Sequence, residues 1–213
     1  MKERPILFSG PMVRAVLDGR KSQTRRVVTD RHLTRLGLEI HDGIAFTLEG
    51  GQWNGMFESG SPPWCPYGIP GDRLWVRETW RFADEDVVGF RADDSHGEQS
   101  ERVRVLAERY WHRPSGFAPL HWLPSIYMPR WASRITLEVV AVRVERLQDI
   151  TADDAKSEGV EVCKHFADAN KGHPLDPHRV AFAWLWNTIN GSDAWIANPW
   201  VWVVEFKRLE QPK

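Results

Sequence analysis

The pattern of apolar and polar positions along the chain predicts more strands than helices. Apolar or alternating segments predict strands at residues 5–8, 73–82, 103–110, 135–147 and 200–206, and a hairpin near residues 44–48. The segment at 135–147 (ITLEVVAVRVERL) is the clearest, because its first half is apolar on both faces, as in a strand that is buried on both sides. Along 73–82 one face carries Leu74, Val76, Trp80 and Phe82, with Glu78 among them.

Three helices are predicted from their end signals. Pro11 suits the first turn of a helix and Gly19 the position just past its end. Thr151 is the expected cap of a second helix that stops at Gly159, and residues 178–189 are amphipathic. Residues 30–70 are expected to be irregular apart from the hairpin, and the polar, charged residues 84–102 to be a surface loop; no repeat or alternation of strand and helix is visible. The fold class predicted is α+β, mainly β: a closed or partly closed barrel with flanking helices.

Composition indicates a globular protein of one domain, residues 1–213. The 28 Lys and Arg residues against 29 Asp and Glu residues give a net charge of −1, which argues against a strongly basic nucleic-acid coat protein. The N-terminus lacks the apolar core of a signal peptide, and no segment is apolar enough to span a membrane. We therefore expect a cytoplasmic protein with no membrane association and no obligate protein partner.

Twelve tryptophans are an unusual feature of the composition. They supply large flat surfaces for a core or for stacking on a base. Those in predicted helices and strands near the C-terminus are expected in the core: Trp184, Trp186, Trp200 and Trp202. Those next to charged or hydroxyl residues are the candidates for stacking: Trp75, Trp80 and Trp131.

Glu138 is the first candidate for chemistry. Its neighbours on both faces of the predicted strand are apolar, and a carboxyl group in that setting either has a raised pKa or has a cationic partner. Two roles remain open for Glu138: it is either a catalytic acid or a carboxylate in an ordinary ion pair. Glu78 is a weaker case of the same kind, for which pairing with a neighbouring arginine is favoured.

A second candidate is the basic turn, residues 19–26 (GRKSQTRR), whose four cations and two hydroxyls are suited to binding an anion. Lys21 would act as a base there only if burial and neighbouring cations lower its pKa. Spacing alone favours a solvated basic turn. The Cys and His residues around 163–178 match no zinc pattern, so neither a metal nor a cofactor is predicted.

Three segments together resemble the ASCH family of PUA-like β-barrels: PILFSGPMVRAVLDGRKSQTRR, PGDRLWVRETW and MPRWASRITLEVVAVRVERLQDIT. The resemblance covers residues 4–29, 66–82 and 126–160, and most resembles the larger ASCH proteins of phages and prophages. It implies that residues 30–65 and 84–125 are insertions relative to the smallest members. The family motif G-x-K-x-x-[E or T]-x-R is represented by Gly19, Lys21, Thr24 and Arg26.

The threonine version of this motif resembles that of the small bacterial amidohydrolases that deacylate N4-acetylcytidine. That resemblance implies catalytic roles for Lys21 and Thr24, together with Glu138 in a T-x-E-V type segment. Candidate substrate-binding residues beside these elements are Arg26, Phe8, Trp75, Arg77 and Glu78. The implied substrate is a small nucleoside, and no cofactor is implied.

Two alternatives remain open. ASCH domains are also proposed to bind RNA or modified bases without catalysis, which predicts salt-dependent affinity and no turnover. A ribonuclease that uses Lys21 and Glu138 as acid and base is the other, although the sequence offers no well-placed histidine as a second base.

Overall fold

The computed structural model describes residues 1–29, 38–41, 44–47, 52–53, 65–84, 87–98 and 122–210. These residues form two compact units, each of which is described by itself. Unit 1 comprises residues 1–19, 72–138 and 208–213, and unit 2 comprises residues 20–71 and 139–207. The predicted strand at residues 103–110 lies outside the described residues.

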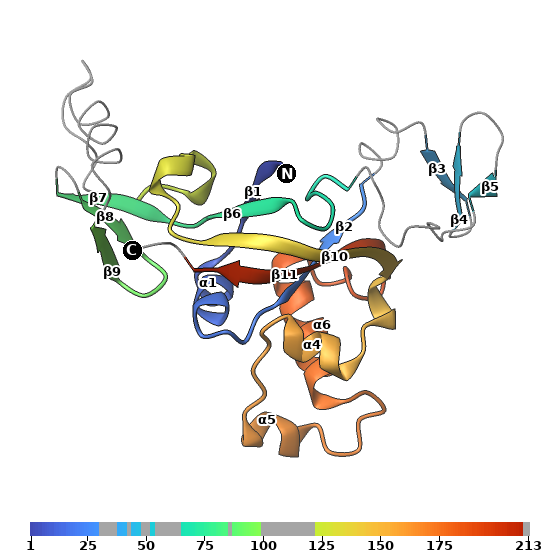
Figure 1. The fold of residues 1–213 in the computed structure, drawn as a ribbon. Coiled ribbons are helices and arrows are strands. Elements are labelled where there is room, and N and C mark those ends of the chain that lie inside the picture. The colour runs from blue at the N-terminus through green and yellow to red at the C-terminus, as the bar shows by residue number, and fades with distance from the viewer. Residues whose placement is uncertain are drawn as a thin grey trace. The chain divides into compact units, whose positions relative to one another are not determined.

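Unit 1 is built from strands and one helix (Figure 1). Its elements are β1 (Glu3–Leu7), α1 (Gly10–Leu17), β6 (Arg73–Arg77), β7 (Trp80–Asp84), β8 (Val87–Phe90), β9 (Ser95–Glu98) and the first residues of β10 (Thr136–Arg146). Strand β6 pairs in parallel with β1 and antiparallel with the start of β10. Strands β7, β8 and β9 form a separate antiparallel sheet. Its apolar residues pack with Met128 and the short helical turn Arg130–Ala132 in a core of Trp80, Phe82, Val88, Phe90, Met128 and Ala132; a second helical turn, Ser125–Tyr127, has no buried residue.

Unit 2 combines helices with the longest strands. Its elements are β2 (Gln23–Val27), β3 (Leu38–His41), β4 (Ile44–Thr47), β5 (Gln52–Trp53), the rest of β10, α4 (Ala152–Ser157), α5 (Lys164–Ala169), α6 (Pro177–Asn190) and most of β11 (Trp200–Leu209), with a helical turn at Leu147–Asp149. Strand β11 pairs antiparallel with β2. Helices α4 and α6 lie side by side (Figure 1). A core of Leu147, Ile150, Ala155, Phe182, Trp186, Val201 and Val203 joins these helices to β11.

The main sheet has the strand order β1-β6-β10-β11-β2 and mixes parallel with antiparallel pairs. The described part of the chain is therefore a mixed α/β structure with more strand than helix, in agreement with that part of the prediction. The expected barrel is not closed, because β1 and β2 are the outer strands of an open sheet. Closure depends on strand tilt and stagger, which the local pattern of apolar residues does not specify.

The helix and strand predictions that rest on end signals and long patterns are confirmed. Helix α1 has its proline in the first turn, α4 begins after Thr151, and α6 and β10 match the predicted ranges to within two residues. Near residues 44–48 the structure has the pair β3–β4, extended by β5 into a three-stranded sheet. In the described residues no helix is long and apolar enough to cross a membrane.

Five local predictions need correction. The segment 73–82 is two strands, β6 and β7, although Glu78 and its apolar partners are buried on one side as expected. The supposed loop at 84–102 contains β8 and β9, and the basic turn runs into strand β2 at Gln23. Trp184 is exposed rather than in the core, and Trp80, a stacking candidate, is buried.

Candidate functional site

Lys21 is buried in unit 2, and its amino group is surrounded by acceptors. Its Nζ donates hydrogen bonds to the carbonyl oxygen of Gln23 at 2.7 Å, to that of Glu158 at 2.9 Å and to Oε2 of the Glu158 carboxylate at 2.7 Å. The side chains of Lys21 and Glu158 are only 1% and 5% exposed. An ammonium group has three N–H donors and no acceptor, so three acceptors match the charged form of lysine. In this arrangement Lys21 is an ammonium in a buried ion pair.

The end of α4 brings Glu158 to this position. Helix α4 begins with a capping box, in which Thr151 and Asp154 exchange hydrogen bonds, and ends at Glu158. Gly159 follows with a φ of +82°, a conformation that lets the chain turn directly after the helix. The Ser22 N–H donates to the Ser157 carbonyl at 2.9 Å, and Lys21 and Glu158 form an antiparallel bridge. The basic turn is therefore held against the C-terminal end of α4.

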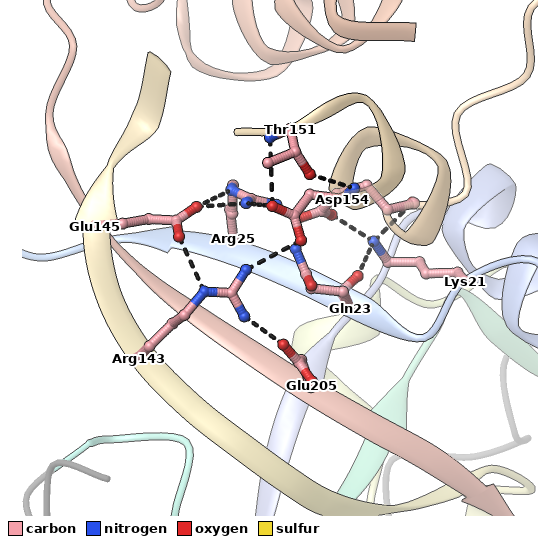
Figure 2. A network of polar contacts seen from close by, with 9 residues as sticks. Lys21, Gln23, Arg25, Arg143, Glu145, Thr151, Asp154 and Glu205 are labelled. Atoms are coloured by element: carbon pink, nitrogen blue, oxygen red, sulfur yellow. Dashed lines mark hydrogen bonds and ion pairs between the residues drawn. The ribbon is translucent and has the colours of Figure 1, made fainter. Parts of the chain in front are cut away.

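Arg25 continues the same polar cluster on β2 (Figure 2). Its side chain is fully buried and forms ion pairs with Glu145, with Asp154 at 3.3 Å and with Oε1 of Glu158 at 3.3 Å. The Glu158 carboxylate thus binds Lys21 through one oxygen and Arg25 through the other.

Arg143 on β10 binds two carboxylates of this cluster and joins a further one to it. It donates to Glu145 at 2.9 Å, to Asp154 at 3.0 Å and to Glu205 on β11. The connected cluster, which we call the β2–α4 network, therefore holds three cations and four carboxylates: Lys21, Arg25, Arg143, Glu145, Asp154, Glu158 and Glu205 (Figure 2). The surplus of acceptors stabilises the charged forms of all three cations.

Burial and charge shift the pKa values of this network in definite directions. Burial lowers the pKa of Lys21, and Arg25 and Arg26 lower it further, whereas the carboxylate of Glu158 acts in the opposite direction. Burial raises the pKa of Asp154, but hydrogen bonds from Thr151 and the charges of Arg25 and Arg143 outweigh it, so this pKa lies below its usual value. Lys21 is the group in this network whose proton is made easier to remove.

Thr24 lies on β2, three residues after Lys21, and is buried. It pairs with Val204 of β11, while Arg25 pairs with Val203, a member of the core next to α6. Because side chains alternate along a strand, Thr24 and Arg26 share the face opposite that of Arg25. The segment that carries the motif therefore presents its threonine on one face of β2 and Arg25 on the other.

In unit 1, Glu138 shares a face with two of the predicted substrate-binding residues. The start of β10 pairs with β6 so that Glu138 lies opposite Arg73, and Thr136 lies opposite Trp75. Directly opposed residues and alternate residues share a face, so Glu138, Trp75 and Arg77 are on the same side of this sheet. Glu138 is half-buried, and Val140, expected on a buried face, is exposed. The prediction of a fully apolar setting for Glu138 is therefore wrong.

Trp75 on this face is covered by arginine side chains. The Arg77 guanidinium carbon lies 4.6 Å from the centre of the indole ring, and that of Arg130 lies 6.0 Å from it. Such contacts are attractive because the ring face is negative. Arg77 also donates to the carbonyl oxygen of Ile126 at 3.1 Å, which fixes its position over the ring.

Glu78 and Phe8 lie on the other side, in the interior of unit 1. Phe8 is 3% exposed and Glu78 is 1% exposed, so neither presents an accessible surface to a ligand. Both carboxylate oxygens of Glu78 accept hydrogen bonds from Arg134 at 2.9 Å. Burial raises the pKa of Glu78, and Arg134 opposes this rise. An ion pair of Glu78 with an arginine is confirmed, but the partner is Arg134, 56 positions away, and not a neighbour in sequence.

The sequence analysis missed Glu158, and also Arg143, Glu145 and Glu205 of the same network. A usable signal was present, because Thr151 and Gly159 locate a helix that ends at Glu158. An acidic residue at a helix C-terminus is unfavourable next to the negative end of the helix dipole, which indicates that it has a cationic partner elsewhere. A comparison of the chain with protein-family models, with curated proteins and with solved structures finds no match.

Proposed function

We propose that the protein is an amidohydrolase that removes an N4-acyl group from cytidine or a cytosine derivative. The observation that carries the proposal is the buried Lys21 of the motif segment, whose pKa is lowered by burial. Lysines act as proton acceptors near neutral pH when burial and neighbouring cations lower their pKa. The ASCH resemblance then supplies the reaction and the roles of Thr24 and Glu138.

The surroundings of the basic turn support an enzyme over an anion-binding surface. Arg20 forms an ion pair with Glu161 at 3.1 Å, Lys21 pairs with Glu158, and Arg25 pairs with three carboxylates. Phosphate recognition needs cations that are exposed to the ligand. Arg20, Lys21 and Arg25 are instead neutralised by acidic side chains of the same unit.

In the proposed reaction, neutral Lys21 accepts the proton of the Thr24 hydroxyl as the Thr24 oxygen bonds to the acyl carbon. The bond from the acyl carbon to N4 then breaks, and Glu138 gives its proton to N4. Water hydrolyses the acyl-threonine ester: one water proton goes to Glu138, and Thr24 regains its proton from Lys21. Positioned acid–base groups of this kind each contribute ~10²–10⁴-fold in rate. In a variant of the scheme, Lys21 or Glu138 activates water directly and Thr24 orients the substrate.

The first test is an absorbance time course with N4-acetylcytidine and N4-benzoylcytidine. We expect the wild-type protein to form cytidine, and Lys21→Ala, Thr24→Val and Glu138→Gln to lose at least ~10²-fold in kcat/KM. Lys156→Ala is the matched lysine control, because Lys156 is exposed on α4. Circular dichroism establishes that each variant is folded. A wild-type protein that hydrolyses neither compound would refute the proposal.

Thr24→Ser separates the two forms of the mechanism. A serine keeps the hydroxyl and removes one methyl group, so the nucleophilic scheme predicts that much of the activity is retained and that an acyl-enzyme forms. Mass spectrometry of the acid-quenched protein would detect an acyl group on residue 24. Full activity of Thr24→Val would assign the attack to water instead.

A second candidate function is binding of single-stranded RNA or a modified base through unit 1. The observation that favours it is the pair of guanidinium groups of Arg77 and Arg130 over the Trp75 ring. The ring itself is only 8% exposed, so a base would stack on these guanidinium groups or on Tyr127, which is 69% exposed. Bases stack on aromatic rings and on guanidinium planes. This function predicts that affinity for oligonucleotides falls with salt and that Arg77→Ala weakens binding, whereas Arg208→Ala on β11 does not. Absence of binding at low salt would rule it out.

A further inference from the structure

The Glu158 carboxylate has an unusual position for an acidic side chain. It is almost completely buried, and each of its oxygens contacts a different cation: Oε2 lies 2.7 Å from Lys21 Nζ, and Oε1 lies 3.3 Å from an Arg25 nitrogen. The same residue also offers its backbone carbonyl to Lys21 at 2.9 Å. Two of the three acceptors around Lys21 therefore come from one residue, and one of them carries the negative charge.

The other charged groups around the pair do not replace this charge. On β2, the positive charges of Arg25 and Arg26 lower the pKa of Lys21 and so oppose its charged form. On β10, Glu145 binds Arg25 and Arg143, and on α4, Asp154 binds the same two arginines. On β11, Glu205 binds Arg143. These carboxylates are thus engaged with the arginines, and the carboxylate in contact with Lys21 Nζ is that of Glu158.

We propose that Glu158 is a positioning residue that keeps Lys21 protonated in the resting protein and thereby sets the pH above which Lys21 can act as a base. Removing the negative charge while keeping the shape leaves a buried cation that donates to backbone carbonyl oxygens, which carry no net charge. That cation then loses its proton at a lower pH, because burial disfavours the charged form. A single opposite charge in contact changes a pKa by ~1–3 units.

The kinetic part of this inference rests on the proposed function. Glu158→Gln is expected to move the rising, acidic limb of the pH profile of kcat/KM to lower pH by ~1–3 units. Glu158→Asp retains the charge and is expected to stay near the wild-type profile. Glu161→Gln is the matched control, since Glu161 is exposed and pairs with Arg20 rather than Lys21. If Glu158 had only a structural role, Glu158→Gln would lower activity at all pH values without moving the rising limb of the pH profile. A rising limb that stays at its wild-type pH would refute the proposal.

A second measurement is independent of activity. In protein labelled with ¹⁵N-lysine, the Lys21 amino signal is assigned from its loss in Lys21→Arg and followed through a pH titration. We expect an ammonium at neutral pH in the wild type and a lower pKa in Glu158→Gln. A neutral Lys21 in the wild type at pH 7 would overturn the proposal, and this arm is informative even where Glu158→Gln does not fold. A wild-type protein without turnover would refute the amidohydrolase, while the titration would still decide the role of Glu158.

Discussion

The ion pair of Glu78 and Arg134 in unit 1 allows a quantitative prediction for Arg134→Met. Arg134 donates to both oxygens of Glu78, to both oxygens of Asp93 and to the Ser95 hydroxyl, and its guanidinium carbon lies 4.1 Å from the centre of the Phe90 ring. All five N–H groups of the guanidinium are therefore used. Methionine keeps most of the apolar stem but removes the charge and every one of these hydrogen bonds.

The magnitude follows from the burial of Glu78. Its side chain is 1% exposed, so without Arg134 it is a buried carboxylate that lacks its cation. Losing one partner of a buried pair costs about 3–5 kcal/mol of unfolding free energy. Asp93 is 30% exposed, so the loss of its contact adds no more than about 1 kcal/mol.

The pH dependence has a definite sign. Burial already raises the pKa of Glu78 in the wild type, and the charge of Arg134 opposes that rise. In Arg134→Met the pKa rises further. A carboxyl group with a raised folded-state pKa favours the folded state at acidic pH, and this contribution is lost as the pH rises through the folded-state pKa. The deficit of Arg134→Met is therefore largest at neutral pH and shrinks toward acidic pH.

Urea unfolding at about pH 7.5 and about pH 5 measures both effects. We expect Arg134→Met to be less stable by about 3–5 kcal/mol at the higher pH and by clearly less at the lower pH. The double variant Arg134→Met with Glu78→Leu, which leaves no buried charge at this position, is expected to recover most of the loss. A loss below about 1 kcal/mol at neutral pH, or an equal loss at both pH values, would contradict this reasoning.

Three further predictions concern unit 2. Thr151→Ala removes the cap of α4 and is expected to cost about 1 kcal/mol in urea unfolding. Asp154 has a lowered pKa, so the stability that its carboxylate contributes is present above the unfolded-state pKa near 4 and is lost as the pH falls through the lower folded-state pKa. Asp154→Asn is therefore expected to destabilise the protein at pH 7 and progressively less as the pH falls below about 4, measured by urea unfolding. Trp186→Ala, in the core, is expected to lower stability by about 3–5 kcal/mol, whereas Trp184→Ala, at 68% exposure, is expected to change it by less than about 0.5 kcal/mol in thermal or urea unfolding.

The predictable parts of the fold are those whose determinants are local. Thr151 and Gly159 bracket α4 because a cap residue and a left-handed glycine act within one turn of the chain. Strand β10 is recognisable because its first half is a long run of mostly apolar residues, although Val140 in this run is exposed. These signals do not depend on which other element packs nearby, so the sequence alone is sufficient for them.

Other elements depend on contacts that the local pattern does not reveal. Val88 and Phe90 are fully buried in β8, but their segment is rich in acidic residues and was expected to be a surface loop. The strand at residues 73–82 is interrupted after Arg77, where the backbone N–H of Glu78 lies 3.3 Å from the sulfur of Met128 instead of continuing a ladder. The burial of β8 and the break after Arg77 both occur where the chain contacts residues about 40–50 positions away. Ser95, close to β8, binds Arg134, and Glu78 contacts Met128.

The basic turn shows why a charge cluster in a sequence does not identify a ligand. Four cations in eight residues favour an anion site when only the turn is considered. In the fold, α4, β10 and β11 supply carboxylates to this cluster, and Lys21 and Arg25 are buried rather than presented to solvent. A buried lysine is of little use for attracting phosphate, but it is suited to exchanging a proton, provided that its countercharge is controlled. The protonation state of Lys21, and hence the choice between a structural and a catalytic lysine, therefore depends on Glu158, a residue 137 positions away.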